Sequence, residues 1–200
     1  MMRVVLASAS PRRSDLLTTV GVTFVVAPAD IDETELAGED PVSYVHRLAI
    51  GKADAAAARV DVRPDDLVIA ADTTVDVDGE ILAKPLDADD AQRMLGLLSG
   101  RAHTVHTGVA VRCGTRIEAE VATTVVSMVD IDAARMRWYL GTGEPFGKAG
   151  AYAIQGAGSV LVERIDGSVT NVVGLPLTVL DRLLGRFGTS LTALAAPGAG

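Results

Sequence analysis

The sequence predicts an α/β fold in which helices flank a mixed, twisted sheet, forming one domain over residues 1–200. The length of 200 residues suits a single domain, or one domain folded as two lobes around a cleft. The composition, 48% apolar and 22% charged, is that of a globular chain with a sizeable core. Strand patterns alternate with helical patterns and hairpin turns, so parallel and antiparallel strands are both expected.

Short apolar runs rich in β-branched residues predict the strands. In chain order they cover residues 3–7, 23–27, 67–77, 80–83, 103–112, 117–128 and 160–165. The Asp78-Gly79 pair between the third and fourth runs is typical of a tight hairpin turn. The Asp166-Gly167 pair supplies another turn after the last run. The sequence therefore predicts hairpins as well as crossover connections.

Apolar positions at helical spacing predict the helices between these strands. The first helix passes through Leu16 and Leu17 and ends before Gly21, a natural stop. The second begins at Pro41, because proline suits the first turn of a helix. Between them lies an acidic loop over residues 30–35. Two further helices are expected over residues 88–98 and 132–140.

The C-terminal part of the chain is less regular. Residues 141–158 are rich in glycine and predict an irregular segment before the last strand. Asn171 is a plausible N-cap for a final helix that reaches Arg186. The small residues near the end predict a frayed tail over 189–200.

Charge and cysteine content narrow the class of protein. The net charge of −8 argues against a nucleic-acid partner, which would require a basic face, although a few cations in a cleft can still bind a small anion. Cys113 is the only cysteine, so no intramolecular disulfide can form, which fits a reducing cytoplasm. No stretch approaches the roughly 20 apolar residues of a membrane span. We therefore expect a cytoplasmic protein that binds neither nucleic acid nor membrane.

The segment from Ser8 to Arg13 lies where the first strand gives way to the first helix. A helix start offers unpaired N–H groups and a positive dipole end, which bind phosphate, and arginine adds bidentate hydrogen bonds. Alternatively, Ser10 caps the helix with Pro11 at its first position, and the arginines are solvated. The segment alone does not decide between these interpretations, which are compatible.

Lys52 lies three residues after Ala49 and seven after Val45, so it projects from the apolar face of its helix. A lysine in this position either snorkels outward or is held by an anionic partner. Without further context, snorkelling is the more common outcome. Lys52 is therefore a candidate ligand for an anion rather than an established one.

Asp72 follows Val68 to Ala71, a run that reads as a strand inside the sheet. Burying a carboxylate there is costly unless it meets a metal, a cation or a catalytic task. Lys84 precedes Pro85 on the return strand, which would bring it near the Asp72 hairpin. A simple cross-strand ion pair would explain the same pattern.

These motifs belong to a longer series that resembles the Maf family of nucleoside-triphosphate pyrophosphatases from end to end. In chain order the series comprises Leu6–Arg13, Asp32-Glu33, Leu48-Ala49 with Lys52-Ala53, Ala71–Thr73, Lys84-Pro85, Leu98–Arg101, Lys148–Tyr152, Ile154–Gly156 and Val173–Leu177. Each motif is weak alone, and their order and spacing carry the resemblance. It implies a deep cleft in a fold similar to that of inosine-triphosphate pyrophosphatases, and a homodimer.

The resemblance also implies a reaction and roles for particular residues. A nucleoside triphosphate is cleaved between its α and β phosphates with the help of a divalent cation: Mg²⁺, Mn²⁺ or Co²⁺. Asp72 would act as general base and, with Glu33, hold the metal. The residues that would bind the substrate phosphates are Ser8, Arg12, Arg13, Lys52 and Lys84.

One branch of the family prefers dTTP and UTP and carries the residues found here at Arg12, Thr73 and Gln155. Another branch prefers 7-methyl-GTP and has tryptophan, glutamine and glutamate at these positions. The Gln155 amide can donate and accept hydrogen bonds at once, which suits the imide edge of uracil or thymine. The sequence therefore predicts a dTTP and UTP pyrophosphatase.

Two rival interpretations remain open at this stage. The first is a nucleotide-binding regulator of septum formation that acts through a protein partner, an effect from which the family takes its name. The second is a house-cleaning hydrolase with broad activity against CTP or modified pyrimidine triphosphates. Assays of pyrophosphate release from a panel of nucleotides would separate all three.

Overall fold

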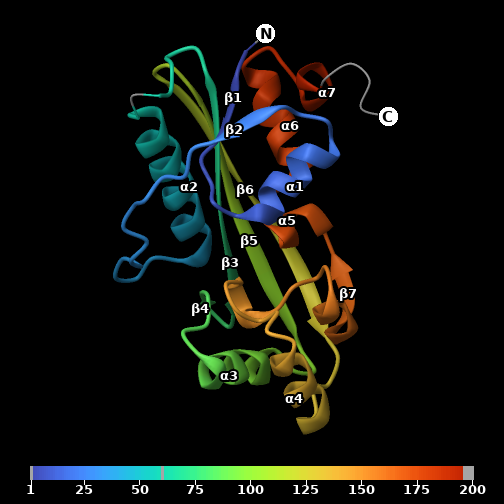
Figure 1. Cartoon of the computed structure of the whole chain (residues 1–200). Coiled ribbons are helices and arrows are strands. Elements are labelled where there is room, and N and C mark those ends of the chain that lie inside the picture. Colours follow the sequence, from blue (N-terminus) through green and yellow to red (C-terminus); the bar gives the residue numbers. More distant parts are fainter. Residues whose placement is uncertain (1, 60, 196–200) are drawn as a thin grey trace. The chain divides into compact units, whose positions relative to one another are not determined.

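The computed structural model describes residues 2–59 and 61–195 (Figure 1). Within them, hydrogen bonds join seven strands into a mixed sheet in the order β2-β1-β3-β5-β6-β7, with β4 paired to β3. The strands are β1 (Val4–Leu6), β2 (Phe24–Val26), β3 (Leu67–Val77), β4 (Glu80–Leu82), β5 (Ala102–Cys113), β6 (Arg116–Met128) and β7 (Val162–Asp166). The predicted mixed sheet is confirmed.

Helices and short 3₁₀ segments connect and flank these strands. The α-helices are α1 (Pro11–Thr19), α2 (Pro41–Ala57), α3 (Ala88–Leu98), α4 (Ala133–Gly141), α5 (Val169–Val173), α6 (Leu177–Arg186) and α7 (Leu191–Leu194). The 3₁₀ helices are η1 (Ala149–Ala151) and η2 (Ala157–Leu161). No helix in the described part of the chain is both long enough and apolar enough to cross a membrane.

Strand directions follow the predicted mixture of crossovers and hairpins. Strand β1 pairs in parallel with both of its neighbours, Val4 lying opposite Phe24 and Leu67. Strand β4 returns antiparallel to β3, and β7 pairs antiparallel to β6. Between β3 and β4, Asp78 and Gly79 have φ angles of 55° and 86°, the left-handed pair that a tight hairpin requires.

The chain divides into two compact units. The first unit comprises Met1–Asp72, Thr107–Ala122 and Gly174–Gly200. The second unit comprises Thr73–His106 and Thr123–Val173. Strands β3, β5 and β6 therefore contribute residues to both units.

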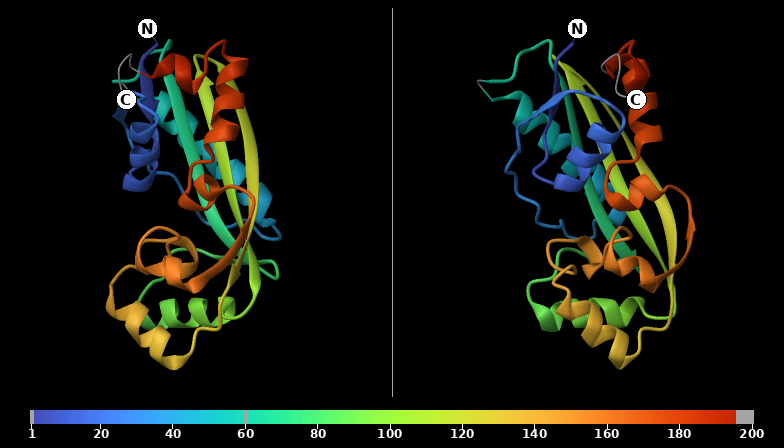
Figure 2. Two further views of the ribbon diagram at one scale, coloured as in Figure 1. Left: turned by 90° about the vertical axis from the view of Figure 1, so that its right-hand side faces the viewer. Right: turned by 45° about the vertical axis from the view of Figure 1, so that its right-hand side comes forward.

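In the first unit the sheet is covered on both faces, because side chains alternate along its strands. From β3, Leu67 and Ile69 join the core beneath α1, α6 and α7, whereas Val68 and Ala70 join the core beneath α2. Figure 2 shows these helices on opposite sides of the sheet. The residues that α2 contributes to its core are small: Ala49, Ala53 and Ala56.

Helix α2 lies very close to the sheet at Gly108 of β5. A Cβ atom at that position would lie 2.2 Å from the backbone oxygen of Val45, which only a glycine avoids. The close approach positions the buried face of α2, including Lys52, directly over the sheet.

The second unit has a core of its own, in which β3 and β5 contribute Val75 and Val105. Helix α3 packs against α4 and η1. The largest side chain that is fully buried is Tyr139 of α4, which has 0% of its surface exposed. Its hydroxyl is hydrogen-bonded within the unit, as a buried phenol requires.

Two expectations for the C-terminal third are wrong: the helix capped by Asn171 and the strand that begins at Val160. Asn171 caps no long helix: it is buried in α5, and its amide donates to Val105 O and Thr124 Oγ1. The last long helix begins only at Leu177, after Pro176. Val160 belongs to η2 rather than to a strand. Of the predicted tail, 196–200 lie outside the described residues, but α7 is helical and buries two leucines.

Candidate active site

The predicted phosphate-binding segment joins β1 to α1 in the first unit. Ser10 occupies the N-cap position of α1, yet its side chain makes no capping hydrogen bond. Ser8 Oγ instead accepts hydrogen bonds from Ser10 N at 3.2 Å and from Arg13 Nη1 at 3.0 Å. No acidic residue lies in the first turn of this nine-residue helix. Its positive end is therefore left without a capping side chain or a compensating carboxylate.

The two arginines that follow are held in different ways. Arg13 is anchored, because its Nε donates to Gly174 O at 2.7 Å in addition to the bond to Ser8. Burial lowers the pKa of the Arg13 guanidinium, and the Asp72 carboxylate opposes this. Arg12 forms no hydrogen bond or ion pair within the described residues, and burial lowers its pKa. Both groups stay cationic because the reference pKa of arginine is so high; Arg12 is thus a cation without an internal partner.

Lys52 of α2 points into the first unit rather than out to solvent. Only 8% of it is exposed, and its Nζ lies 2.6 Å from Glu33 Oε1 and 2.6 Å from Asp72 Oδ1. Lys52 therefore does not snorkel to solvent; anionic partners hold it, which is the second of the two interpretations given above. The helical spacing that put Lys52 on the apolar face was the signal for this contact.

Asp72 is buried on β3, with 8% of it exposed, in line with its position after an interior strand. Lys52 occupies its Oδ1 atom. Its other oxygen, Oδ2, has no hydrogen-bond partner within the described residues. A water molecule or a cation can therefore approach Oδ2 while Lys52 holds the carboxylate in place.

Two residues missed by the sequence analysis anchor the acidic loop that carries Glu33. Tyr44 of α2 donates its hydroxyl hydrogen to Glu33 O at 3.0 Å, and its pKa is raised to about 12 by burial and by the charges of Asp72 and Glu33. One turn further, Arg47 donates to Glu39 Oε1 at 2.6 Å and to Thr34 O at 3.1 Å. Tyr44 and Arg47 lie three apart on one helix, the only signal in the sequence that they act together.

The residues present suit a small divalent cation. Glu33 and Asp72 reach the same lysine nitrogen, so their oxygens can be no farther apart than the sum of those two contacts. Carboxylate oxygens are the ligands that Mg²⁺ prefers, and it commonly binds one or two of them together with water and substrate phosphates. Among the described residues, no group of three or more potential ligand side chains forms a complete site. A cation at this pair would therefore be completed by water and substrate.

The remaining predicted site residues belong to the second unit. Thr73 follows Asp72 on β3, so its side chain points to the opposite face of the sheet. Lys84 is exposed in the bend after β4, beyond the β3–β4 ladder, so it is not a cross-strand partner in that hairpin. Gln155 is exposed in the loop between η1 and η2. Their roles in substrate binding and base choice stay predictions.

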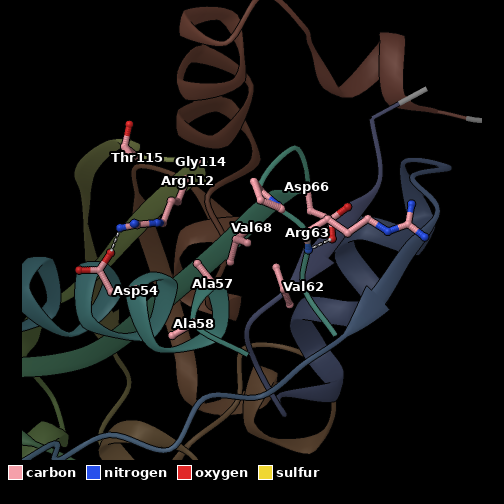
Figure 3. A pocket seen from close by; sticks show the side chains of 11 residues that line it. Asp54, Ala57, Ala58, Val62, Arg63, Asp66, Val68, Arg112, Gly114 and Thr115 are labelled. Carbon is pink, nitrogen blue, oxygen red and sulfur yellow. Dashed lines mark hydrogen bonds and ion pairs between the residues drawn. The ribbon is translucent and has the colours of Figure 1, made fainter. Parts of the chain in front are cut away.

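A separate pocket of about 290 Å³ lies at the C-terminal end of α2 (Figure 3). None of the predicted site residues lines it. Arg112 is paired with Asp54 and Asp66 with Arg3, whereas the Arg63 guanidinium forms no hydrogen bond or ion pair with the described residues. The pocket therefore has one cation without an internal partner, but it contains none of the residues of the candidate active site.

Fold and site together define an α/β protein equipped to bind a polyphosphate beside two carboxylates. The chain belongs to the Maf family, since residues 3–187 match the family described as Maf-like protein.

Several curated relatives are similar to this chain over nearly its whole length, and they bear the name dTTP/UTP pyrophosphatase. The relative from Anaeromyxobacter dehalogenans strain 2CP-1 is 52% identical, covering 94% of this chain and 96% of its own. The relative from Myxococcus xanthus is 51% identical over 94% of each chain. The relative from Methylobacillus flagellatus is 48% identical over 96% of each chain. Among solved structures, the Staphylococcus aureus Ham1 protein is similar over 64% of this chain and 72% of its own, with 18% identity and a TM-score of 0.47.

Proposed function

We propose that this protein is a nucleoside-triphosphate pyrophosphatase that hydrolyses dTTP and UTP to the monophosphate and pyrophosphate. The observation that carries the proposal is the buried Lys52 ammonium between Glu33 and Asp72, near an arginine pair at an uncapped helix start. Relatives about half identical to this chain bear the name of that activity. Membership of the Maf family supports the same assignment.

The phosphate chain of the substrate binds at the start of α1. The free N–H groups of the first turn and the Arg12 guanidinium supply donors aimed at anionic oxygens. Arg13 and Ser8 are already hydrogen-bonded to each other, so they meet the phosphates in a preorganised geometry. Lys84 adds a further cation for the leaving pyrophosphate.

Asp72 positions and deprotonates the attacking water. The water oxygen forms a bond to the α phosphorus, the bond from that phosphorus to the bridging oxygen breaks, and the bridging oxygen leaves with pyrophosphate. The water proton passes to the Asp72 oxygen that Lys52 leaves open. Lys52 holds the carboxylate in this orientation.

Glu33 and Asp72 are the residues that would hold a divalent cation, either Mg²⁺, Mn²⁺ or Co²⁺. Such a cation, when bound, neutralises charge on the phosphate oxygens. Tyr44 and Arg47 keep the Glu33 loop on α2, so the second carboxylate stays within reach of the first.

Base choice rests on Gln155, with Arg12 and Thr73 as the accompanying specificity residues. The Gln155 amide offers both a donor and an acceptor to the imide edge of uracil or thymine. We also infer that the enzyme acts as a homodimer in the cytoplasm, where its nucleotide substrates are found. CTP and modified pyrimidine triphosphates are secondary substrates.

Pyrophosphate release by the purified protein tests this proposal. We expect turnover of dTTP and UTP in the presence of Mg²⁺ or Mn²⁺. The turnover of 5-methyl-UTP should be close to that of UTP, and the turnover of CTP should be weaker. The turnover of 7-methyl-GTP should be poor. A clear preference for 7-methyl-GTP would contradict the role of Gln155. Binding of nucleotides without any pyrophosphate release would instead support a regulator that acts through a protein partner.

A further inference from the structure

We propose that Glu144 and Tyr139 are positioning residues that set nucleobase selectivity by holding the loop that carries Gln155. The inference rests on the proposed function, because it assumes that Gln155 meets the base of the substrate. It concerns only side chains of the second unit, and it assigns a task to the half-buried Glu144 and the buried Tyr139, which the proposed reaction does not use.

The Glu144 carboxylate accepts hydrogen bonds from the part of this loop that follows Gln155. Its Oε2 accepts a hydrogen bond from Ala157 N at 2.9 Å, and its Oε1 accepts one from Gly158 N at 2.8 Å. Both backbone groups lie just after Gln155 in the chain. Oε1 also accepts the hydroxyl hydrogen of Tyr139 at 2.9 Å.

Tyr139 holds the near side of the same loop. Its hydroxyl oxygen accepts a hydrogen bond from Ala153 N at 3.0 Å while its hydrogen goes to Glu144. Gln155 therefore sits between two clamped points, Ala153 two residues before it and Ala157 two residues after it. The loop is tied on both sides to one connected pair of side chains.

The loop wraps so closely on this pair that two of its positions must be glycine. Gly156 has a φ of 93°, and a Cβ atom there would lie 2.3 Å from Glu144 Oε2. At Gly158 a Cβ atom would lie 2.4 Å from Ala153 O of the loop itself and 2.6 Å from the Tyr139 hydroxyl oxygen. The glycine after Gln155 is thus required by the carboxylate beneath it, as well as by its backbone angle.

Neutral donors make the hydrogen bonds to the Glu144 carboxylate. Burial acts to raise the pKa of Glu144, but the hydrogen bonds from Gly158, Ala157 and Tyr139 and the charge of Lys148 outweigh it, so the pKa is lowered. Lys148 Nζ is bonded to the backbone oxygen of Glu144, as a further tie on the segment. A carboxylate satisfied in this way has no reason to move when an anionic substrate arrives.

Gln155 itself depends on this support. Its side chain is exposed and forms no hydrogen bond with the described residues. Because no side-chain partner orients the amide, its position is set by the backbone on which it stands. A shift of about 1 Å in that backbone is enough to misplace a hydrogen-bonding group.

The test compares nucleobase selectivity with overall activity in Glu144→Gln and Tyr139→Phe. The readout is the ratio of kcat/KM for UTP to kcat/KM for GTP. We expect each change to lower this ratio by about tenfold or more, since a site built to hydrogen-bond a substrate edge loses discrimination when misaligned. The kcat for GTP should stay within about twofold of wild type, because the phosphate-binding groups are untouched.

Glu163→Gln is the matched control, since Glu163 is an exposed glutamate on β7 of the same unit. It should leave the ratio unchanged. In a Gln155→Ala background, Glu144→Gln should lower the ratio no further, because the effect passes through Gln155. Equal losses for UTP and GTP in Glu144→Gln would mean a merely structural role and would overturn the proposal.

A binding measurement separates this proposal from the proposed function. The dissociation constants of α,β-methylene-UTP and α,β-methylene-GTP are measured by calorimetry on the full chain. If the wild-type protein binds the uridine analogue more tightly but releases no pyrophosphate, the enzymatic function is wrong. The effect of Glu144→Gln on the binding preference would still decide whether Glu144 is a positioning residue. If Glu144→Gln does not fold, Tyr139→Phe gives the same reading, because it removes the hydrogen bonds of the phenol to Ala153 N and to Glu144. An unchanged preference in the folded variant would overturn the inference.

Discussion

Each of the two units of this protein fixes one carboxylate, the buried Asp72 in the first and the half-buried Glu144 in the second, and the two are fixed by different partners. In the first unit Asp72 faces the ammonium group of Lys52 at 2.6 Å and keeps one oxygen open. In the second unit Glu144 is surrounded by two backbone N–H groups and a phenol hydroxyl. The ammonium group of a side chain can give way to a metal ion, whereas backbone N–H groups are fixed by the fold. The first arrangement suits chemistry and the second suits support.

The largest effect is expected when the Asp72 carboxylate, which has one oxygen without a partner among the described residues, is replaced by a neutral amide. Asp72→Asn should lower the turnover of UTP by about 10² to 10⁴, the usual cost of removing a general base. Stopped assays of pyrophosphate release measure it. Asp76→Asn on the same strand is the matched control and should keep most of the activity, since the Asp76 carboxylate accepts from Gly79 N in a hairpin turn. Turnover of the Asp72 variant within about threefold of wild type would refute its assignment as base.

A second test concerns how closely α2 lies against the sheet in the first unit. Gly108→Ala puts a methyl group against Val45 O, so we expect a loss of about 1–3 kcal/mol in the free energy of unfolding, as for other overpacked sites. Urea unfolding measures it. Gly96→Ala in α3 of the second unit is the control, because its methyl group meets no atom within 4 Å. That change should stabilise the protein by up to about 1 kcal/mol. Equal effects of the two changes would contradict the close approach.

Removing the cation of the first unit sharpens the contrast further. Lys52→Met leaves Glu33 and Asp72 facing each other, and we expect a loss of about 1–3 kcal/mol, less than for a fully buried pair because Glu33 is 48% exposed. Added Mg²⁺ should raise the Tm of this variant more than that of wild type, since a cation can replace the ammonium group. A variant that melts like wild type and ignores Mg²⁺ would show that the two carboxylates do not depend on Lys52.

The second unit should respond to acid through His103, the smallest of these effects. Burial lowers the pKa of His103 to about 4, and its Nε2 is bonded to the Tyr152 hydroxyl at 2.8 Å. An unfolded histidine titrates near 6.5, so the stability from neutral His103 is present above that pH and is lost as the pH falls toward 4. We expect a loss of about 1–2 kcal/mol between pH 7 and pH 5 from this group. His103→Gln should flatten that part of the urea-unfolding profile, and parallel profiles would exclude the assignment.

Local sequence signals predicted most of the helices and strands. They failed where contacts with residues distant in the sequence determine the structure. The strand over 67–77 and the helix over 88–98 have the predicted bounds, because apolar periodicity and turn residues act within a few positions. The intrinsic preference of asparagine predicts a cap at Asn171, but its amide, in α5, bonds to the two strands β5 and β6. Pro176 inside the predicted helix was the available warning, since proline interrupts a helix interior.

The same division holds for the site. Lys52 on an apolar helix face and Asp72 after an interior strand were visible as costly burials, and the structure brings them together. The anchoring of Arg13 by Gly174 O was not visible, because the two residues are 161 positions apart. Glu144 also escaped notice, since its partners are backbone groups that any sequence provides. Charged side chains that are costly to bury can be recognised in the sequence, but the groups that hold them in place can be identified only from the fold.

The composition of the first unit from three separate segments also bears on how the protein is made. Its core beneath α1 includes Leu175, Leu180 and Leu184, which come from the last segment of the chain. These residues leave the ribosome late, and the start of α1 must wait for Gly174 O before Arg13 can be anchored. A chain that stops before residue 174 should therefore be recognised by the cell's proteases as unfinished, although Lys52, Asp72 and Gln155 have all been translated.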